Sequence, residues 1–205
     1  RDGTFSTIDI ISNINNMGTQ FINIFTHGNH TSGGGFTNYD VSNNLFNSTY
    51  PIIYSQGCLN ASLDFGPEDS IGELFVISSH GGVAFVGNTR YGWYYPGAVE
   101  YGPSQIFDEE FFSVLFEENF AKLGDAFYRS KANLAGLLSD YTRYVYLELI
   151  LFGDPELDAI SPVSTPPEQN QGYVYYVKDG NIYKLSLIHI SEPTRLLSIS
   201  YAVFC

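Results

Sequence analysis

The chain has 205 residues, of which 44% are hydrophobic and 15% are charged, a composition typical of a globular protein with room for one α/β domain. Its 22 acidic and 9 basic residues give a net charge of −13, which repels phosphate backbones and argues against a nucleic-acid partner. No apolar run is long enough to span a membrane. The two cysteines, Cys58 and Cys205, do not make a disulfide framework, and an internal cysteine with histidines elsewhere is a candidate nucleophile.

Three apolar segments predict strands of one sheet. Residues 18–27 form a short buried strand that runs into His27, and residues 51–57 form a second strand that delivers Cys58. Residues 81–87 form a third. Each strand is apolar on both faces, which favours a mostly parallel sheet covered by helices on both sides.

Helices are predicted between and after these strands. A glycine-rich loop at 31–38 leads to a short helix at 41–46. Residues 68–78 predict a helix that Ser70 caps and Glu73 completes as a capping box.

Residues 105–160 follow mainly helical patterns in sequence. Residues 105–138 predict helical territory, with the acidic residues 108–110 in its first turn and a break at Gly124. Residues 141–152 are compatible with a helix or a strand. The fold predicted for residues 1–160 is therefore an α/β sandwich of three layers.

The composition changes after residue 160. Residues 161–172 are rich in proline and predict a linker. Residues 173–185 predict a hairpin that turns at Asp179-Gly180, interpreted as the start of a β-rich domain. Residues 186–205 lose the pattern of the rest and resemble translated adapter sequence. We interpret them as a non-native tail and exclude His189 and Cys205 with them.

Cys58 and His27 together suggest acyl-transfer chemistry. Ligands gather at the carboxyl ends of parallel strands, where both residues are expected. An imidazole takes the thiol proton and later gives it to the leaving amine. Gly28 and Gly57 leave room for a peptide backbone, and the N–H groups of Gly28 and Cys58 are candidates for an oxyanion hole. Taken singly, a cysteine or a histidine after a strand is usually structural.

Five sequence runs resemble the gingipain family of the caspase-like cysteine peptidases. They are NIFTHG at 23–28, PIIYSQGC at 51–58, SIGE at 70–73, GGVAFVGNTRYGW at 81–93 and LFGDPEL at 151–157. The last two are the most specific, and the resemblance covers about residues 18–160. It implies a caspase-like three-layer sandwich and a cysteine endopeptidase that acts on polypeptides through a thioester.

The resemblance also implies roles for individual residues. His27 corresponds to the general base and acid, and Cys58 to the nucleophile. Trp93 corresponds to a residue near the pocket for the side chain before the cleaved bond, although a packed aromatic explains it equally well. The family further implies a secreted or cell-surface enzyme, calcium as a structural ion, no cofactor or metal for the chemistry, and further β domains of the same chain.

The front of the chain departs from the family pattern. In the family, the specificity pocket and a third acidic residue come from strands well upstream of the histidine, and here only 26 residues precede His27. We therefore expect the peptidase domain to lack its upstream strands. The sequence does not define the residue preferred at the cleaved bond.

Two other functions compete with the peptidase. The first is a caspase-like module without activity. The presence of both Cys58 and His27 argues against it. The second is a cell-surface or carbohydrate-binding module that stacks sugars on the tyrosine- and tryptophan-rich segment 91–101.

Overall fold

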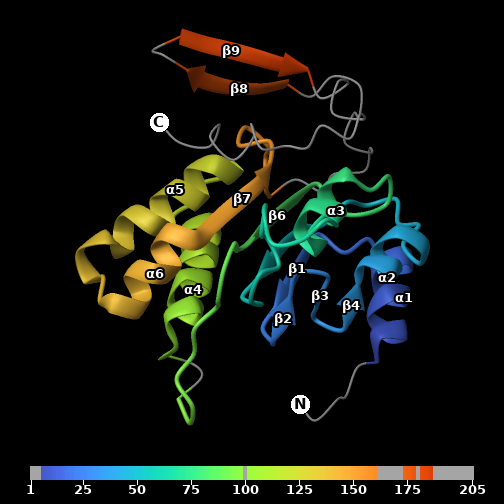
Figure 1. Ribbon diagram of the computed structural model, residues 1–205, viewed down its shortest axis with the longest axis horizontal. Coiled ribbons are helices and arrows are strands. Elements are labelled where there is room, and N and C mark those ends of the chain that lie inside the picture. The colour runs from blue at the N-terminus through green and yellow to red at the C-terminus, as the bar shows by residue number, and fades with distance from the viewer. Residues whose placement is uncertain (1–5, 99–100, 161–172, 179–180, 187–205) are drawn as a thin grey trace.

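The main sheet has four strands in the order β1-β5-β6-β7 (Figure 1). The computed structural model describes residues 6–98, 101–160, 173–178 and 181–186. The strands are β1 Phe21–Ile24, β5 Ile52–Ser55, β6 Ala84–Asn88 and β7 Leu149–Gly153. The first three are mutually parallel and β7 runs antiparallel to β6, which confirms the mostly parallel sheet.

Helices cover both faces of this sheet (Figure 1). One layer holds α1 Thr7–Met17, α2 Asn38–Asn43 and α3 Ile71–Ile77; the other holds α4 Pro103–Phe116, α5 Leu123–Leu134, the short helix η2 Ala135–Leu137 and α6 Asp140–Glu148. Alternate strand residues point to opposite faces. Ile53 and Phe85 pack against the first layer, whereas Ile52 and Tyr54 pack against the second. The predicted three-layer sandwich is confirmed.

Capping boxes define the starts of the helices in the first layer. Ser70 accepts a hydrogen bond from the Glu73 backbone, and the Glu73 side chain accepts from the Ser70 N–H at 2.8 Å, as the sequence predicts. Ser6 and Asp9 form the same arrangement at the start of α1. Helix α1 was not among the predicted elements, although Ile10, Ile11 and Ile14 face the first core layer.

Two details of the second layer correct the sequence prediction. Helix α4 begins at Pro103, so Asp108 lies beyond the first turn, and its side chain is buried. The break between α4 and α5 falls at residues 117–122, where Asn119 has a φ of 59°, while Gly124 lies in the first turn of α5. The ambiguous segment 141–152 is shared between α6 and β7.

The segment after His27 is more ordered than the loop that its glycines predict. It forms a small antiparallel sheet of β2 Gly28–Asn29, β3 Ser32–Gly33 and β4 Phe36–Thr37. Gly34 and Gly35 have φ values of 63° and 85°, which allow the tight turn between β3 and β4. Two-residue strands joined by such turns lack the alternating pattern that marks a strand in a sequence.

The predicted hairpin near the end of the chain is present. Strand β8, Tyr173–Lys178, pairs antiparallel with β9, Asn181–Ser186. Its turn residues, the linker at 161–172 and residues 187–205 lie outside the described residues. The division into domains and the tail assignment stay predictions.

Candidate active site at the carboxyl edge of the sheet

His27 and Cys58 follow paired parallel strands in the same register. Strand β1 pairs with β5 at a constant offset of 31 residues (52 − 21), and the Gln56 N–H donates to the Ile24 carbonyl at 2.9 Å beyond the strand ends. His27 lies three positions after Ile24, and Cys58 lies three after Ser55, so their offset is also 31 (58 − 27). Both residues therefore emerge at the same edge of the sheet, from neighbouring strands.

The loop after β6 contacts both residues. The Cys58 thiol is partly buried and lies 3.8 Å from the carbonyl oxygen of Gly92. Two residues further on, the Tyr94 ring makes an edge contact with the exposed His27 ring, with 5.9 Å between centroids. Gly92 and Tyr94, in the segment 89–98 that follows β6, thus lie beside the two predicted catalytic residues.

The other described histidines are structural. The His30 ring is 8% exposed, and its nitrogens lie 2.6 Å from the Ser62 hydroxyl and 2.6 Å from the Glu68 carbonyl. His80 precedes β6 and contacts the Asn47 carbonyl, at the opposite edge of the sheet from Cys58. Of the histidines that the structure describes, His27 alone stands at the carboxyl edge with an exposed ring.

The turn that carries Cys58 has a left-handed residue. Leu59 is buried and has a φ of 61°, a conformation that costs about 1–3 kcal/mol for a bulky residue. Its N–H donates to the Arg90 carbonyl, and the Ala61 N–H donates to the Asn88 carbonyl at 3.0 Å. These bonds hold the turn against the end of β6.

The N–H groups of Cys58 and Gly28, proposed for an oxyanion hole, have different surroundings. Within the described residues, the Cys58 N–H donates no hydrogen bond to another part of the chain. Gly28 opens β2 and is paired with Gly33 in the small sheet. Both lie at the carboxyl edge, one beside each predicted catalytic residue.

Trp93 and Gly57 have clear packing roles. The Trp93 ring lies 4.6 Å from Tyr141 and 5.9 Å from Tyr144, both on α6, and it packs on the core. A Cβ added to the buried Gly57 would meet the Asn60 side chain at 2.3 Å. Packing therefore explains the residue type at both positions, and their roles in substrate binding stay predictions.

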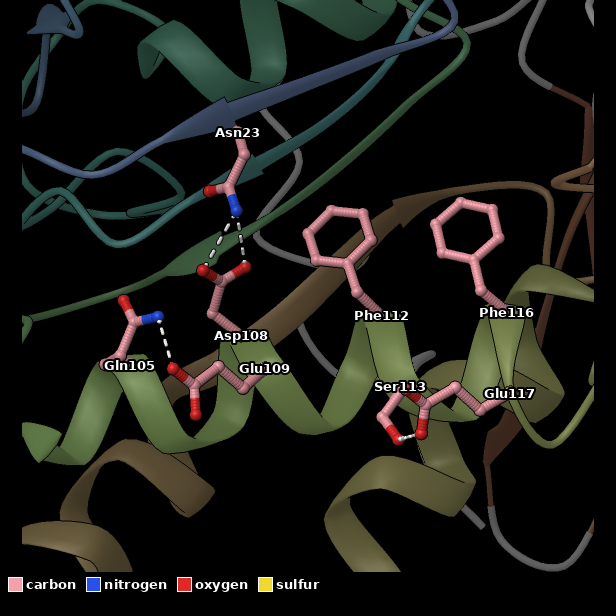
Figure 2. Close-up of a pocket in the computed structure, with 8 residues that line it drawn as sticks. All are labelled: Asn23, Gln105, Asp108, Glu109, Phe112, Ser113, Phe116 and Glu117. Atoms are coloured by element: carbon pink, nitrogen blue, oxygen red, sulfur yellow. Dashed lines mark hydrogen bonds between the residues drawn. The ribbon is translucent and has the colours of Figure 1, made fainter. Parts of the chain in front are cut away.

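A buried carboxyl group supports the chain just before Cys58. Asp108 on α4 accepts two hydrogen bonds of 2.9 Å from the Asn23 amide on β1 (Figure 2). It accepts a third, of 2.7 Å, from the Gln56 side chain. Burial raises the pKa of Asp108 to about 6, although the hydrogen bonds from Asn23 and Gln56 oppose this shift. This role was not predicted, because the sequence pattern placed Asp108 in the first turn of a helix, where its charge would favour the helix dipole.

An open groove of about 410 Å³ runs beside this carboxyl, between the outer side of β1 and α4 (Figure 2). Its lining includes the aromatic rings of Phe112 and Phe116 and the carboxyl groups of Glu109 and Glu117. Asp108 belongs to both the groove and the network that reaches Gln56.

The carboxyl group of Glu148 is also buried, and the residue lies beside the C-terminal end of β6. Glu148 ends α6, is 6% exposed, and its backbone carbonyl accepts from the Thr89 N–H at 3.1 Å. Neither oxygen of its side chain accepts a well-formed hydrogen bond within the described part of the chain. Burial raises the pKa of Glu148 to about 8, which the backbone and charge of Arg90 offset only in part. The Arg90 guanidinium itself pairs with Asp64 at 2.9 Å.

The described residues contain no group of three or more His, Cys, Asp or Glu side chains placed to hold a metal ion. The structural calcium ion that the gingipain resemblance implies stays a prediction. In the same residues, no helix has the length and apolar character needed to cross a membrane.

Comparison with known proteins identifies the class of this fold. Gingipain R, described as an Arg-specific cysteine proteinase, matches with a TM-score of 0.64 and 21% identity over 76% of this chain and 37% of that chain. The complex of the pro- and mature domains of RgpB from Porphyromonas gingivalis matches with a TM-score of 0.63 and 18% identity, over 77% and 38% of the two chains. The domain therefore has the caspase-like α/β fold of the gingipains.

The sequence makes the assignment more specific. The model of peptidase family C25 matches residues 2–160, and the chain belongs to that family. It spans little more than a third of the gingipain chains that it resembles. No curated protein sequence matches it significantly.

Proposed function

We propose that this protein is a cysteine endopeptidase in which Cys58 is the nucleophile and His27 the general base and acid. The observation that carries the proposal is the shared register of the two residues beyond neighbouring parallel strands. Membership of peptidase family C25 supports it, because the family is one of peptidases.

The reaction begins with proton transfer from the Cys58 thiol to the His27 imidazole. The thiolate attacks the carbonyl carbon of the scissile peptide bond, and the negative charge that develops on the carbonyl oxygen is stabilised by the N–H groups of Cys58 and Gly28. The C–N bond then breaks as His27 gives its proton to the departing amine, leaving a thioester on Cys58. Water, deprotonated by His27, attacks the thioester, releases the carboxylate product and restores the thiol.

Three features of the edge support this assignment. The Cys58 thiol is only partly buried, so a substrate carbonyl has access to it. The His27 ring is exposed, whereas His30 has both nitrogens engaged. The loop 89–98 borders both residues, and we propose that it forms one wall of the substrate site, with Trp93 near the side chain that precedes the cleaved bond.

The proposed substrate class and location are based on the resemblance to the gingipains. Gingipain R is described as an Arg-specific cysteine proteinase. We propose a polypeptide substrate for this protein as well, and a secreted or cell-surface location. The residue preferred at the cleaved bond is left open, since the identity to gingipain R is 21%.

Alkylation of Cys58 tests the pair directly. A cysteine paired with an imidazole is held more as thiolate at neutral pH than an isolated cysteine, so iodoacetamide should label it faster. Labelling is followed by mass spectrometry of the Cys58 peptide, because Cys205 also carries a thiol. We expect His27→Ala to slow the labelling at least about tenfold.

His80→Ala is the matched control, because His80 lies at the opposite edge of the sheet and should leave labelling unchanged. Equal rates in the wild type and in His27→Ala would remove His27 from the reaction. The full-length natural protein should also cleave members of a peptide library. Binding to glycans without cleavage of any peptide would instead favour a carbohydrate-binding module that uses the exposed tyrosines near Trp93.

A further inference from the structure

The side chain of Asn60 joins the two segments that carry Cys58 and His27. Asn60 is fully buried in the turn after Cys58. Its amide nitrogen donates to the carbonyl oxygens of Asn29 at 2.7 Å and Ser32 at 2.9 Å, which lie in the β2–β3 hairpin that follows His27. A longer contact of 3.4 Å reaches the Cys58 carbonyl. One amide group therefore bridges the nucleophile turn and the histidine hairpin.

The orientation of this amide is defined by its partners. Backbone carbonyls only accept hydrogen bonds, so the NH₂ group must face Asn29 and Ser32. The amide oxygen accepts from the Ser55 hydroxyl at 2.7 Å, and this hydroxyl oxygen also accepts from the Gly57 N–H at 3.1 Å. Ser55 is the last residue of β5. The network thus runs from the strand that delivers Cys58, through Asn60, to the hairpin attached to His27.

Three glycines surround the same amide. A Cβ added to Gly28, Gly33 or Gly57 would meet the Asn60 side chain at 2.6, 2.2 or 2.3 Å, closer than van der Waals contact allows. Gly28 and Gly33 belong to the two strands of the hairpin, whereas Gly57 precedes Cys58. None of the three has a positive φ, so close packing on Asn60 is the reason for glycine at these positions.

We propose that Asn60 is a positioning residue that holds the His27 segment at a fixed distance and angle from Cys58. This inference rests on the proposed function, since it assumes that the two residues react as a pair. Asn60 touches no substrate in this account. It acts because a planar amide, with partners on three sides and glycine surfaces around it, cannot rotate or shift without breaking buried hydrogen bonds.

Asn60 differs from other buried asparagines in that it connects the segments that carry Cys58 and His27. Asn47 provides the comparison, because it is 1% exposed and its amide donates to two backbone carbonyls, of Thr49 at 2.8 Å and Gly81 at 3.0 Å. Those carbonyls precede β5 and β6, at the edge of the sheet opposite Cys58. Removing either amide removes similar interactions, but only Asn60 connects the reactive segments.

A double-mutant cycle tests the proposal. Iodoacetamide labelling of Cys58 is measured at pH 7 in the wild type, Asn60→Ala, His27→Ala and the double variant, with Asn47→Ala as the matched control and thermal unfolding recorded for each. We expect Asn60→Ala to slow labelling about tenfold, as His27→Ala does. The double variant should be no slower than His27→Ala alone, because both changes remove the same pairing. Asn47→Ala should lower the melting temperature comparably and leave labelling unchanged.

Each outcome decides between the claims. If His27→Ala labels as fast as the wild type, the proposed function and the positioning role both fail. If His27→Ala is slow but Asn60→Ala labels like Asn47→Ala, the positioning role alone is wrong. The positioning role would also be wrong if the two substitutions reduced the labelling rate of Cys58 multiplicatively in the double variant. Should Asn60→Ala not fold, Ser55→Ala removes the hydroxyl that donates to the amide oxygen and accepts from the Gly57 N–H, and slower labelling in a folded protein is then required.

Discussion

His27 and Cys58 follow the adjacent parallel strands β1 and β5. Each lies three residues beyond the last residue of its strand, so the two occupy equivalent register positions. Equivalent residues of neighbouring strands lie about 4.8 Å apart. Placing two reactive groups after such strands therefore brings them to one edge without a specialised loop. The buried bonds of Asn60 and Asp108 add lateral support to the two segments as they leave the sheet.

Gly33→Ala should destabilise the fold because its Cβ would lie 2.2 Å from the Asn60 amide oxygen. Asn60 is fully buried and bonded on three sides, so it has no room to move. We expect the free energy of unfolding to fall by about 2–3 kcal/mol, the scale of an overpacked core. Denaturant unfolding measures the change. Gly136→Ala is the control, since nothing lies within 4 Å of its added Cβ and the expected change is a gain of at most about 1 kcal/mol.

Asp108 should make the stability of the protein depend on pH. Its pKa is about 6 in the folded protein against an ordinary value of 3.8, so the folded state holds the proton more tightly. Its contribution to stability is complete below about pH 4 and is lost as the pH rises through 6, by up to about 3 kcal/mol. Asp108→Asn should flatten the unfolding free energy over this interval. The exposed Asp125→Asn should not, and a pH profile unchanged by Asp108→Asn would contradict the assignment.

The main elements of the fold could be predicted because their signals are local. The apolar runs before His27 and Cys58 identify two strands, and the Ser70–Glu73 pair identifies the start of α3. Residues 141–152 could not be assigned, because one segment contains both the end of a helix and a strand. The direction of β7 depends on its pairing with β6, which no local pattern reveals.

The supporting residues of the site could not be predicted for a different reason. Asn23 and Asp108 are 85 residues apart in sequence, and Asn60 and Asn29 are 31 apart. Asparagine and aspartate are common in exposed turns, so the sequence gives no sign that Asp108 and Asn60 are buried. Only the folded chain shows that the acidic run on α4 turns one carboxyl toward the strand that delivers Cys58.

Glu148 should produce a second pH dependence, at higher pH. Its pKa is about 8 in the folded protein against an ordinary value of 4.5, so the contribution of the protonated form is lost as the pH rises through 8. Glu148→Gln should raise the stability at pH 9 relative to the wild type and have a smaller effect at pH 5. Chemical denaturation at both values measures this. Equal differences at pH 5 and pH 9 would show that Glu148 is not protonated in the folded state.

The final prediction concerns the reaction of Cys58 in the full-length natural protein. Cys58→Ala should bind a peptide substrate about as tightly as the wild type while kcat falls at least about 10⁴-fold, because the lost interaction exists only along the reaction path. Cys58→Ser should be similarly inactive, since a hydroxyl in a site built for a thiolate stays protonated near neutral pH.

Calorimetric titration gives the affinity, and cleavage of the same peptide gives kcat. His80→Ala is the control and should keep full activity, because His80 precedes β6 and lies at the opposite edge of the sheet from Cys58. Cleavage by Cys58→Ala at the wild-type rate would exclude Cys58 as the nucleophile. Loss of affinity in proportion to kcat would instead assign the Cys58 thiol a role in holding the substrate rather than in breaking its bond.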